Sequence, residues 1–186
     1  GSGASITAVQ DGHAVDTSMG FTPLAGITMG TRSGDIDVSL VAFLAKKLEI
    51  TMPEMIDILN HKSGLLGISE LSPDMRDLEE TAATRPQSAL ALSIFVNRVV
   101  KYVGSYVALM NGIDTLVFTA GSGENGSELR ADICKQLACF GVKLDEEKNN
   151  VRSQERIISA DDSKVKVLIV PTNEELMIAR DVMRLK

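Results

Sequence analysis

Two short, apolar, β-branched segments, each followed by a loop and a helical pattern, constrain the fold of this chain more than any other feature. Residues 113–119 read Ile-Asp-Thr-Leu-Val-Phe-Thr, and residues 165–170 read Val-Lys-Val-Leu-Ile-Val. Runs of this length and composition are typical of buried parallel strands. Helical spacing follows over 128–140 and again over 174–184. This alternation of strands and helices predicts an α/β layer architecture.

The beginning of the chain predicts a β-hairpin instead. Residues 5–10 and 13–17 have the composition of strands, and Asp11-Gly12 lies between them. This dipeptide is a strong two-residue turn signal, because both turn positions need positive φ. A further extended segment is expected over 26–31.

Helices are expected in the stretch that follows. Apolar residues recur at helical spacing after Asp37, and residues 51–54 (Thr-Met-Pro-Glu) have the form of a capping box that opens a second helix. Ser72-Pro73 is predicted to start another helix, with a hydroxyl cap followed by a residue that lacks an amide hydrogen. Pro86 then interrupts the pattern, and a long helix is expected from about residue 87 to residue 110.

Length and charge limit the classes of function. The chain has 186 residues, of which 44% are hydrophobic and 24% charged. This composition predicts a folded chain, most simply one domain. The net charge of −6 argues against binding to nucleic acid or to an anionic membrane. The longest apolar stretch, 89–110, contains Asn97, Arg98 and Lys101, so a membrane span is not expected.

The cysteines and the first residues bear on where the protein acts. Cys134 and Cys139 are too few and too badly spaced for a zinc site, and they are interpreted as reduced thiols of a cytosolic protein. No signal peptide and no initiator Met are visible. Gly1-Ser2 is interpreted as a possible remnant of cloning, and the chain is expected to begin inside a larger protein.

A glycine-rich loop follows the first predicted strand. Residues 121–126 read Gly-Ser-Gly-Glu-Asn-Gly and precede a helix, so their backbone amides could face an anion or a nucleotide. The run also fits the G-x-G-x-x-G dinucleotide pattern, with acidic residues downstream at 145–147. An NAD-binding oxidoreductase domain is therefore an alternative, although the hairpin-like start is unlike βαβ. A plain connection between strand and helix is the simplest explanation of the loop.

A second run, residues 29–35, reads Met-Gly-Thr-Arg-Ser-Gly-Asp. The planar fork of Arg32 could bind two oxygens of a transferring phosphoryl group and stabilise charge in the transition state. The commoner fate of such an arginine is a surface ion pair, here with Asp35 or Asp37.

Two helix starts carry candidate ligand groups. Thr172 and Glu175 fit a capping box, which leaves Glu174 free to support a Mg²⁺ ion held partly through water and phosphate. The alternative for Glu174 is compensation of the helix dipole. At 74–77, Asp74 is explained as an acidic cap, whereas Arg76 is less favourable near a positive helix end and could bind a ligand.

Taken together and in order, these runs resemble one known family. Residues 16–37 (Asp-Thr-Ser-Met-Gly-Phe-Thr-Pro-Leu-Ala-Gly-Ile-Thr-Met-Gly-Thr-Arg-Ser-Gly-Asp-Ile-Asp) closely resemble the second signature of the acetate kinase family. Residues 72–77, 118–125 and 170–176 are also similar to that family, in its order. The resemblance covers the whole chain, 1–186, but only the C-terminal, nucleotide-binding half of a two-domain kinase. It implies the ribonuclease H-like, actin-like ATPase fold shared by acetate kinases, sugar kinases, actin and heat-shock chaperone ATPases.

The resemblance also implies roles for individual residues. These are Arg32 in stabilising the transferring phosphoryl group, Pro23 in lining the small carboxylate pocket, Asp74, Met75 and Arg76 in contacting the adenosine, Gly121, Ser122, Gly123, Glu124 and Asn125 in forming the second nucleotide loop, and Glu174 in supporting the metal. Gly1 and Gly3 match the end of the family's His-Leu-Gly-Asn-Gly phosphate loop, with Ser2 where Asn is usual. If Gly1-Ser2 is a cloning remnant, only Gly3 belongs to that loop.

Three departures from the family pattern are milder. Ala25 replaces the usual Glu, Val38 the usual Pro, and Ser122 the usual Ile against the adenine. The change at Ser122 is expected to loosen packing on the base, but it removes no charge and no catalytic group.

The activity that the resemblance implies is reversible phosphorylation of acetate by ATP, with Mg²⁺ or Mn²⁺, in a cytoplasmic homodimer. Propionate is the alternative substrate. The family's other catalytic groups, an Arg, an Asp and a His, belong to its N-terminal half. The isolated chain is therefore expected to fold, to bind adenine nucleotide weakly and not to turn over. A non-catalytic interaction module, built on the long apolar helix 89–110, is a further alternative.

Overall fold

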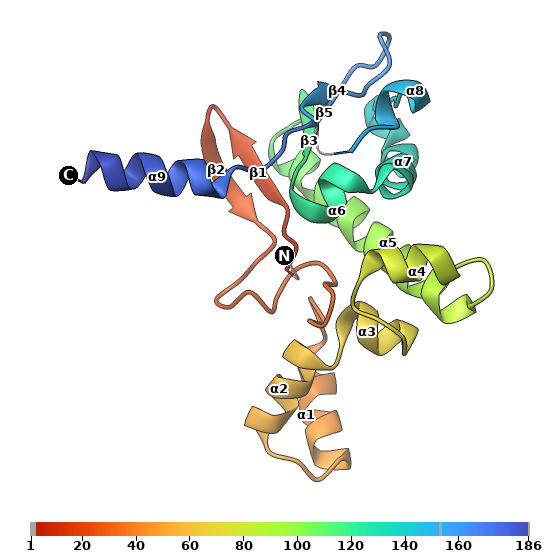
Figure 1. Ribbon diagram of the computed structural model, residues 1–186. Helices are drawn as coiled ribbons and strands as arrows, with labels where there is room; N and C mark the ends of the chain where they lie inside the picture. The colour runs from red at the N-terminus through yellow and green to blue at the C-terminus, as the bar shows by residue number, and fades with distance from the viewer. Residues whose placement is uncertain (1–2, 153, 186) are drawn as a thin grey trace. The chain divides into compact units, whose positions relative to one another are not determined.

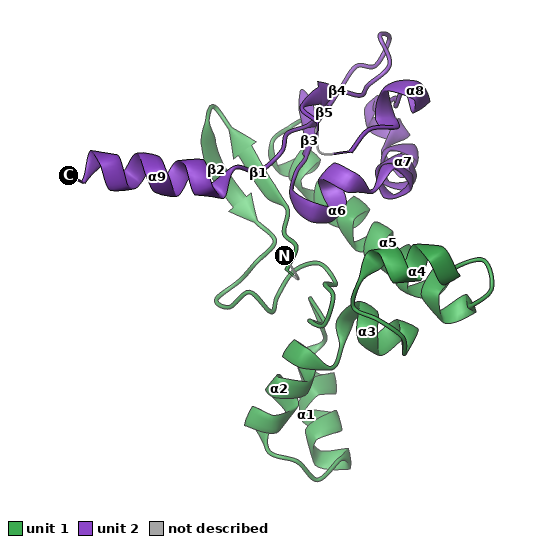
Figure 2. Cartoon of the chain, viewed as in Figure 1, with its two compact units in different colours: residues 1–112 green, residues 113–186 purple. Residues whose placement is uncertain are grey.

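The computed structural model describes residues 3–152 and 154–185, and it divides the chain into two compact units (Figures 1 and 2). Unit 1 comprises residues 1–112 and unit 2 residues 113–186. Each unit has its own secondary structure and buried residues, and each is described by itself below.

Unit 1 opens with the predicted hairpin (Figure 1). Strands β1 (Thr7–Gln10) and β2 (His13–Thr17) pair antiparallel. The turn residues Asp11 and Gly12 have φ of 52° and 80°, so both adopt the left-handed conformation that the sequence predicted. Of the hairpin side chains, that of Ala8 is buried.

The loop between β2 and the first helix contains no strand, and the extended segment predicted over 26–31 is wrong. Its backbone groups bond to a tight turn and to a helix start instead of to a neighbouring strand. The N–H of Met29 donates to the carbonyl of Arg32 at 3.1 Å, and the N–H of Leu65 donates to the carbonyl of Met29 at 2.9 Å. Apolar composition alone cannot distinguish this buried loop from a buried strand.

Helices α1 (Val38–Lys47) and α2 (Met52–His61) form a helical hairpin. Asp37 caps α1 by accepting hydrogen bonds from two backbone N–H groups, and Thr51 and Glu54 form the predicted capping box of α2. The two helices bury a small apolar cluster of Val41, Ala45, Met55 and Leu59.

Helices α3 (Gly64–Ser69) and α4 (Met75–Thr81) both pack against the long helix α5 (Pro86–Leu109). Pro86 is the first residue of α5, where a missing N–H costs nothing. The predicted start of α4 at Ser72 is wrong by two residues. Asp74 is the N-cap, and the Ser72 hydroxyl instead accepts from the N–H of Asp74 and donates to the Asp77 carboxylate.

Unit 2 contains a three-stranded sheet in the order β3–β5–β4. Strands β3 (Thr115–Phe118) and β5 (Lys166–Ile169) pair in parallel, as predicted, and β4 (Arg156–Ile157) pairs antiparallel to β5. The β-branched residues Val167 and Ile169 of β5 are fully buried. The parallel pair places the ends of β3 and β5, and the segments that follow them, at one edge of the sheet.

The helices between β3 and β4 are α6 (Ala120–Asn125), α7 (Ser127–Gln136), the 3₁₀ helix η1 (Ala138–Phe140) and α8 (Glu146–Asn149). The glycine-rich segment was predicted as a loop, and this prediction is wrong. Residues 120–125 form the short helix α6, which starts directly after β3 from Ala120 at a φ of 58°. The sequence could not indicate this, because three glycines in seven residues disfavour a helix.

Helix α9 (Glu174–Arg184) begins and ends where the sequence predicted. Its cap differs from the prediction. Asn173 is the N-cap and accepts from the N–H of Leu176, so the capping box predicted for Thr172 and Glu175 is wrong. Thr172 is engaged elsewhere, as described below. Within the described ranges, no helix is long and apolar enough to cross a membrane.

Candidate functional site

The Arg32 guanidinium lies in the loop between β2 and α1, half-buried and held by neutral groups. Its Nη1 donates to the backbone carbonyl of Pro23 at 3.0 Å and to the Met29 sulfur at 3.5 Å. No carboxylate among residues 3–152 and 154–185 forms an ion pair with it. The alternative of a surface ion pair with Asp35 or Asp37 is therefore wrong, and the cation remains available to an anionic ligand.

Three residues that the sequence assigned to one site meet here. Pro23 provides the carbonyl that accepts from Arg32. Gly3 lies against the guanidinium, because a Cβ placed on Gly3 would be 3.2 Å from Nη1, 3.4 Å from Nη2 and 3.6 Å from Cζ of Arg32. The glycine thus lets the chain approach the charged group closely. Gly1, the other candidate of the phosphate loop, lies outside the described residues.

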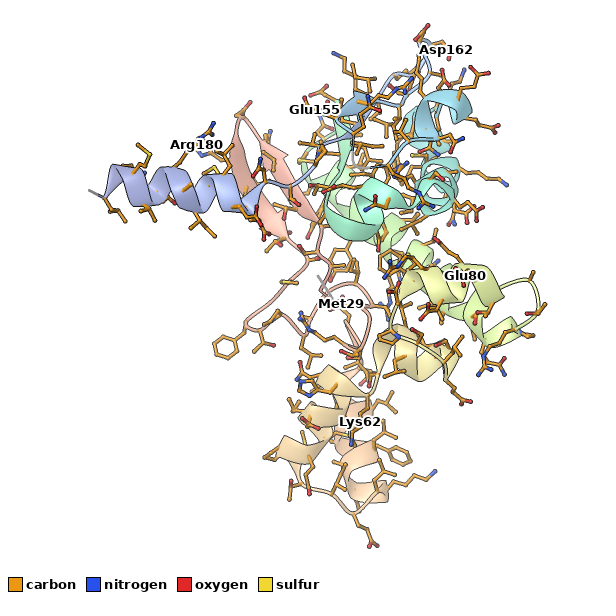
Figure 3. All side chains as sticks on the ribbon, in the orientation of Figure 1. Met29, Lys62, Glu80, Glu155, Asp162 and Arg180 are labelled. Atoms are coloured by element: carbon orange, nitrogen blue, oxygen red, sulfur yellow. The ribbon has the colours of Figure 1, made fainter. Side chains whose placement is uncertain are left out.

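Backbone packing against α3 positions the turn that carries Arg32. Met29, labelled in Figure 3, is 1% exposed, and its carbonyl accepts from Leu65 of α3. Gly64 has a φ of 60°, and a Cβ there would lie 2.2 Å from the Met29 carbonyl oxygen and 2.7 Å from that of Arg32. Residue 64 must therefore be glycine for the turn to sit at this distance from the helix.

Asp35, three residues after Arg32, links the same loop to Gly26 and to helix α5 through hydrogen bonds. Its carboxylate accepts from the N–H of Gly26 at 2.8 Å and from the Tyr102 hydroxyl at 2.5 Å. Arg98, also on α5, donates to the Asp35 carbonyl at 3.1 Å. A surface cavity of about 200 Å³ is lined by Asp35, Arg98, Lys101, Tyr102 and Ser105. Asp35 is thus engaged by α5 and is not the partner of Arg32.

The Tyr102 hydroxyl gives this region a measurable pH response. Burial, and then the hydrogen bond to Asp35, raise the pKa of Tyr102 to about 12 from an ordinary value of 10.0. The folded state therefore favours the neutral phenol, and the associated stability is present below pH 10.0 and is lost as the pH rises towards 12. We expect the free energy of unfolding to fall over this window by roughly 1 kcal/mol per pH unit more in the wild type than in Tyr102→Phe.

Chemical denaturation between about pH 9 and pH 11.5 measures this difference. Equal slopes for the two proteins would contradict the role given to the phenol. Tyr106, whose pKa burial also raises, is present in both proteins and cancels in the comparison.

The predicted adenosine contacts lie at the start of α4. Met75 is buried within unit 1, at 8% exposure. The half-buried Asp74 and the exposed Arg76 pair with each other, Oδ2 to Nη2, at 2.5 Å. This contact lowers the pKa of the Asp74 carboxyl to about 2 and raises that of the Arg76 guanidinium. The pair explains why a cation is tolerated in this first turn: the capping carboxylate neutralises it.

In unit 2, the predicted nucleotide segment forms α6 and is held by its own buried groups. The Glu124 side chain is 8% exposed, and its Oε1 accepts from the backbone N–H of Thr172 at 2.9 Å and from the Thr172 hydroxyl at 3.3 Å. Gly121, Ser122 and Asn125 remain exposed on the same short helix.

Arg130 of α7 is fully buried below α6. Its guanidinium donates five hydrogen bonds, to the carbonyls of Gly123 and Glu124, to the side-chain and main-chain oxygens of Asn149, and to the carbonyl of Val151. The distances lie between 2.7 and 3.0 Å. Burial lowers the pKa of the Arg130 guanidinium.

Glu174 is the first residue of α9 and is exposed. In the part of the chain that the structure describes, its carboxylate has no hydrogen-bond or ion-pair partner, and no group of three or more His, Cys, Asp and Glu side chains could hold a metal ion. A single free carboxylate fits a Mg²⁺ that keeps most of its coordination for water and phosphate oxygens. It does not fit a site made entirely of protein ligands.

Sequence reasoning missed three residues of these sites. Gly64 packs against backbone 32 and 35 residues away, and Tyr102 binds a carboxylate 67 residues away. Arg130 binds oxygens 6 to 21 residues away. The helical spacing around Arg130 could have given a signal, because it places a charged residue between the apolar Leu129 and Ile133.

Comparisons with known proteins bear on the whole chain. The Acetokinase family model matches residues 1–180. The acetate kinase of Limosilactobacillus fermentum is 62% identical over 187 residues, which cover 100% of this chain and 47% of that relative. The acetate kinase of Lacticaseibacillus paracasei is 64% identical over 187 residues, with the same coverage. The chain thus spans about half the length of the curated relatives that it matches.

Solved structures give the same result. The chain matches a crystal structure of Porphyromonas gingivalis acetate kinase with a TM-score of 0.95 and 42% identity, over 100% of this chain and 47% of that one. It matches a propionate kinase from Francisella tularensis with a TM-score of 0.90 and 45% identity, over 96% of this chain and 46% of that one. These matches confirm the predicted α/β, actin-like ATPase fold.

Proposed function

This chain belongs to the acetokinase family, and on that premise we propose that it is the C-terminal, nucleotide-binding part of a carboxylate kinase. The proposed reaction is reversible phosphoryl transfer between ATP and acetate, giving ADP and acetyl phosphate. The name full-length kinase is used for a protein that contains this chain together with the other half found in its relatives. The observation that carries the proposal is the Arg32 guanidinium, which is held in place without a carboxylate partner among the described residues.

Arg32 is the proposed catalytic residue of this chain. Its fork is oriented by the Pro23 carbonyl and the Met29 sulfur, which leaves Nη2 and Nε for oxygens of the transferring phosphoryl group. Because both supports are neutral, they do not cancel its charge. The positive charge can therefore stabilise the extra negative charge that develops in an in-line transfer. Pro23 would line the carboxylate pocket beside it, and Gly1 and Gly3 would end the phosphate loop.

The family resemblance implies nucleotide contacts for two segments, and we propose the same roles here. Asp74, Met75 and Arg76 at the start of α4 would contact the adenosine. Residues 121–125, which the family resemblance implies as the second nucleotide loop and which form part of helix α6, would provide the other contacts, with Gly121, Ser122 and Asn125 exposed. Glu174 would support Mg²⁺, or Mn²⁺, through water and the phosphates, and the ion would neutralise charge on them. Family membership favours this arrangement over the NAD-binding alternative, and Gly121 and Gly123 lie inside a helix and not in a dinucleotide loop.

Propionate remains a second candidate substrate, because one of the matched structures is a propionate kinase at 45% identity. Competition between the two carboxylates for the full-length kinase would decide this. The substrate with the larger kcat/KM is the preferred one.

An acyl-phosphate (hydroxamate) assay tests the proposed function. We expect the full-length kinase to form acyl phosphate from ATP and acetate, and the 186-residue chain alone to form none. The reason is that the chain offers a single candidate catalytic group, whereas phosphoryl transfer depends on several positioned groups. Absence of product with the full-length kinase would contradict the function. Robust turnover by the chain alone would contradict only the inactivity proposed for it.

We also propose a cytoplasmic homodimer that forms through this half of the kinase. Support comes from the family resemblance and from the long helix α5, whose Leu90 and Leu109 are 53% and 58% exposed. Both cysteines are free thiols, which suits a reducing compartment. Light scattering that gives a clean monomer would count against the dimer.

A further inference from the structure

A partly buried polar contact joins two segments of unit 2 that are distant in the sequence. Glu124 of α6 and Thr172, two residues before α9, are separated by 48 positions and share two hydrogen bonds. Thr172 precedes Glu174 by two residues, so the contact lies between the proposed nucleotide loop and the proposed metal-supporting residue. None of the roles given above accounts for this contact.

Burial of the Glu124 carboxylate has a desolvation cost that the rest of the fold must offset. A carboxylate that is 8% exposed loses most of its hydration, and two donors from Thr172 replace only part of it. A neutral residue of similar size would close the same space without this cost. The carboxylate orients the main chain instead. It accepts the shorter of the two bonds from the backbone N–H of Thr172, which fixes the main chain there relative to α6.

Arg130 holds the other side of the same short helix. It donates to the carbonyls of Gly123 and Glu124, in the last turn of α6, and also to oxygens of Asn149 and Val151, so it links these segments. All five acceptors are neutral oxygens, so no carboxylate compensates the buried cation through a hydrogen bond. A six-residue helix rich in glycine is too short to be stable by itself. Its shape therefore depends on Glu124 and Arg130.

We propose that Glu124 and Arg130 are positioning residues of the kinase: together they fix α6 and the turn at Thr172, so that the nucleotide loop and Glu174 keep one arrangement. Glu124 acts through Thr172 and not by touching the nucleotide. This inference rests on the proposed function. Its consequence is that nucleotide binding and metal dependence are coupled through the Glu124–Thr172 contact, whereas binding of acetate is not.

The test uses the full-length kinase with three substitutions. Thr172→Val removes the hydroxyl donor and Glu124→Gln removes the charge, while Thr172→Ser keeps the hydroxyl. We expect Glu124→Gln to raise the KM for MgATP about tenfold, because both hydrogen bonds from Thr172 lose their charged acceptor. Thr172→Val should raise it about fivefold, because one of the two bonds is lost. In both variants the Mg²⁺ concentration that gives the half-maximal rate should rise together with the KM for MgATP. The KM for acetate should stay within about twofold of the wild-type value.

Two controls separate positioning from loss of structure. Glu128→Gln removes the same charge from an exposed position in the first turn of α7, and it should leave all three constants within about twofold of the wild type. Thr172→Ser should restore the values of the wild type. A KM for MgATP that rises without any change in Mg²⁺ dependence would show that Glu124 contacts the nucleotide directly, and would overturn the inference.

Hydrogen exchange gives a second readout that does not need turnover. In Thr172→Val and Arg130→Lys, the amides of 120–126 and of 172–178 should exchange faster together. The rest of unit 2 should be unchanged in Thr172→Val, whereas Arg130→Lys should also speed exchange around residues 149–151, whose oxygens Arg130 binds. Faster exchange in only one of the two segments would overturn the coupling. A wild-type kinase without acyl-phosphate activity would refute the proposed function, whereas an active wild type with unaffected variants would refute this inference alone.

Discussion

Replacement of Arg32 by lysine in the full-length kinase is expected to lower kcat for acyl-phosphate formation about a thousandfold. Lysine keeps the positive charge but loses the planar fork. It could not donate to the Pro23 carbonyl and still present two donors to the phosphoryl oxygens. Because the lost interaction belongs to the transition state, the KM for ATP should change by less than about threefold. Steady-state kinetics of the purified enzyme measure both quantities.

Arg156→Lys is the matched control for this prediction. Arg156 lies exposed on the two-residue strand β4, and the same substitution there should leave kcat within about twofold. An Arg32→Lys enzyme that is folded and retains more than about a tenth of the wild-type kcat would contradict the catalytic assignment of Arg32.

Gly64→Ala is expected to destabilise unit 1 by about 4 kcal/mol, a large share of the stability of a typical domain. The added Cβ would meet the Met29 carbonyl oxygen at 2.2 Å, a distance that only a backbone shift can relieve. The left-handed φ of 60° adds the ordinary strain of a residue with a side chain. Because the shift moves the turn of Arg32, activity of the full-length kinase should fall with stability. Chemical denaturation and the hydroxamate assay measure the two effects.

Gly12→Ala separates these two causes. Gly12 also has a left-handed φ, of 80°, but a Cβ there meets nothing within 4 Å. This substitution should therefore cost only the backbone strain, about 1 kcal/mol, and leave activity unchanged. Equal losses of stability at residues 12 and 64 would show that conformational strain alone explains Gly64, and that close packing against Met29 does not contribute.

Several of the elements that the sequence predicted correctly have local causes. Asp11-Gly12 defines the hairpin turn by its own conformational preference, and Thr51 and Glu54 cap α2 through groups three residues apart. The bounds of α9 follow from its own spacing and polarity. In each case the interacting groups lie within one turn of each other, so a short window of sequence contains the whole interaction.

The elements that the sequence predicted wrongly are stabilised by distant partners. Residues 26–31 look like a strand, but the N–H groups of Leu65 and Leu66 occupy the carbonyls of Met29 and Gly30. Residues 120–125 look like a loop, but Arg130 and Thr172 hold them as a helix. Local propensity gives the wrong answer at both places, because hydrogen bonds from elsewhere in the fold outweigh it.

The candidate site divides in the same way. Arg32 and Glu174 could be proposed from the sequence, because the chemistry that they suggest belongs to the side chain itself, whereas Pro23 was implied only by the family resemblance. The sequence could not predict that Arg32 has no ion pair within the described ranges, because Asp35 and Asp37 are both near enough in sequence to provide one. This arrangement depends on Tyr102 and Gly26, which engage Asp35, and on the N-terminus of α1, which engages Asp37.

The loop that carries Arg32 differs from an ordinary connecting segment in what it can tolerate. At Gly26, Gly34 and Gly64, main chain meets main chain: a Cβ would lie 2.4 Å from the Ser18 carbonyl oxygen, 2.5 Å from that of Gly26 and 2.2 Å from that of Met29, respectively. Surface loops usually absorb insertions and deletions, because little packs against their backbone. Here an extra residue would shift backbone that packs directly against other backbone, and no flexible side chain lies between the two to absorb the shift. Peptide tags and engineered insertions therefore belong at the β1–β2 turn and not in this loop.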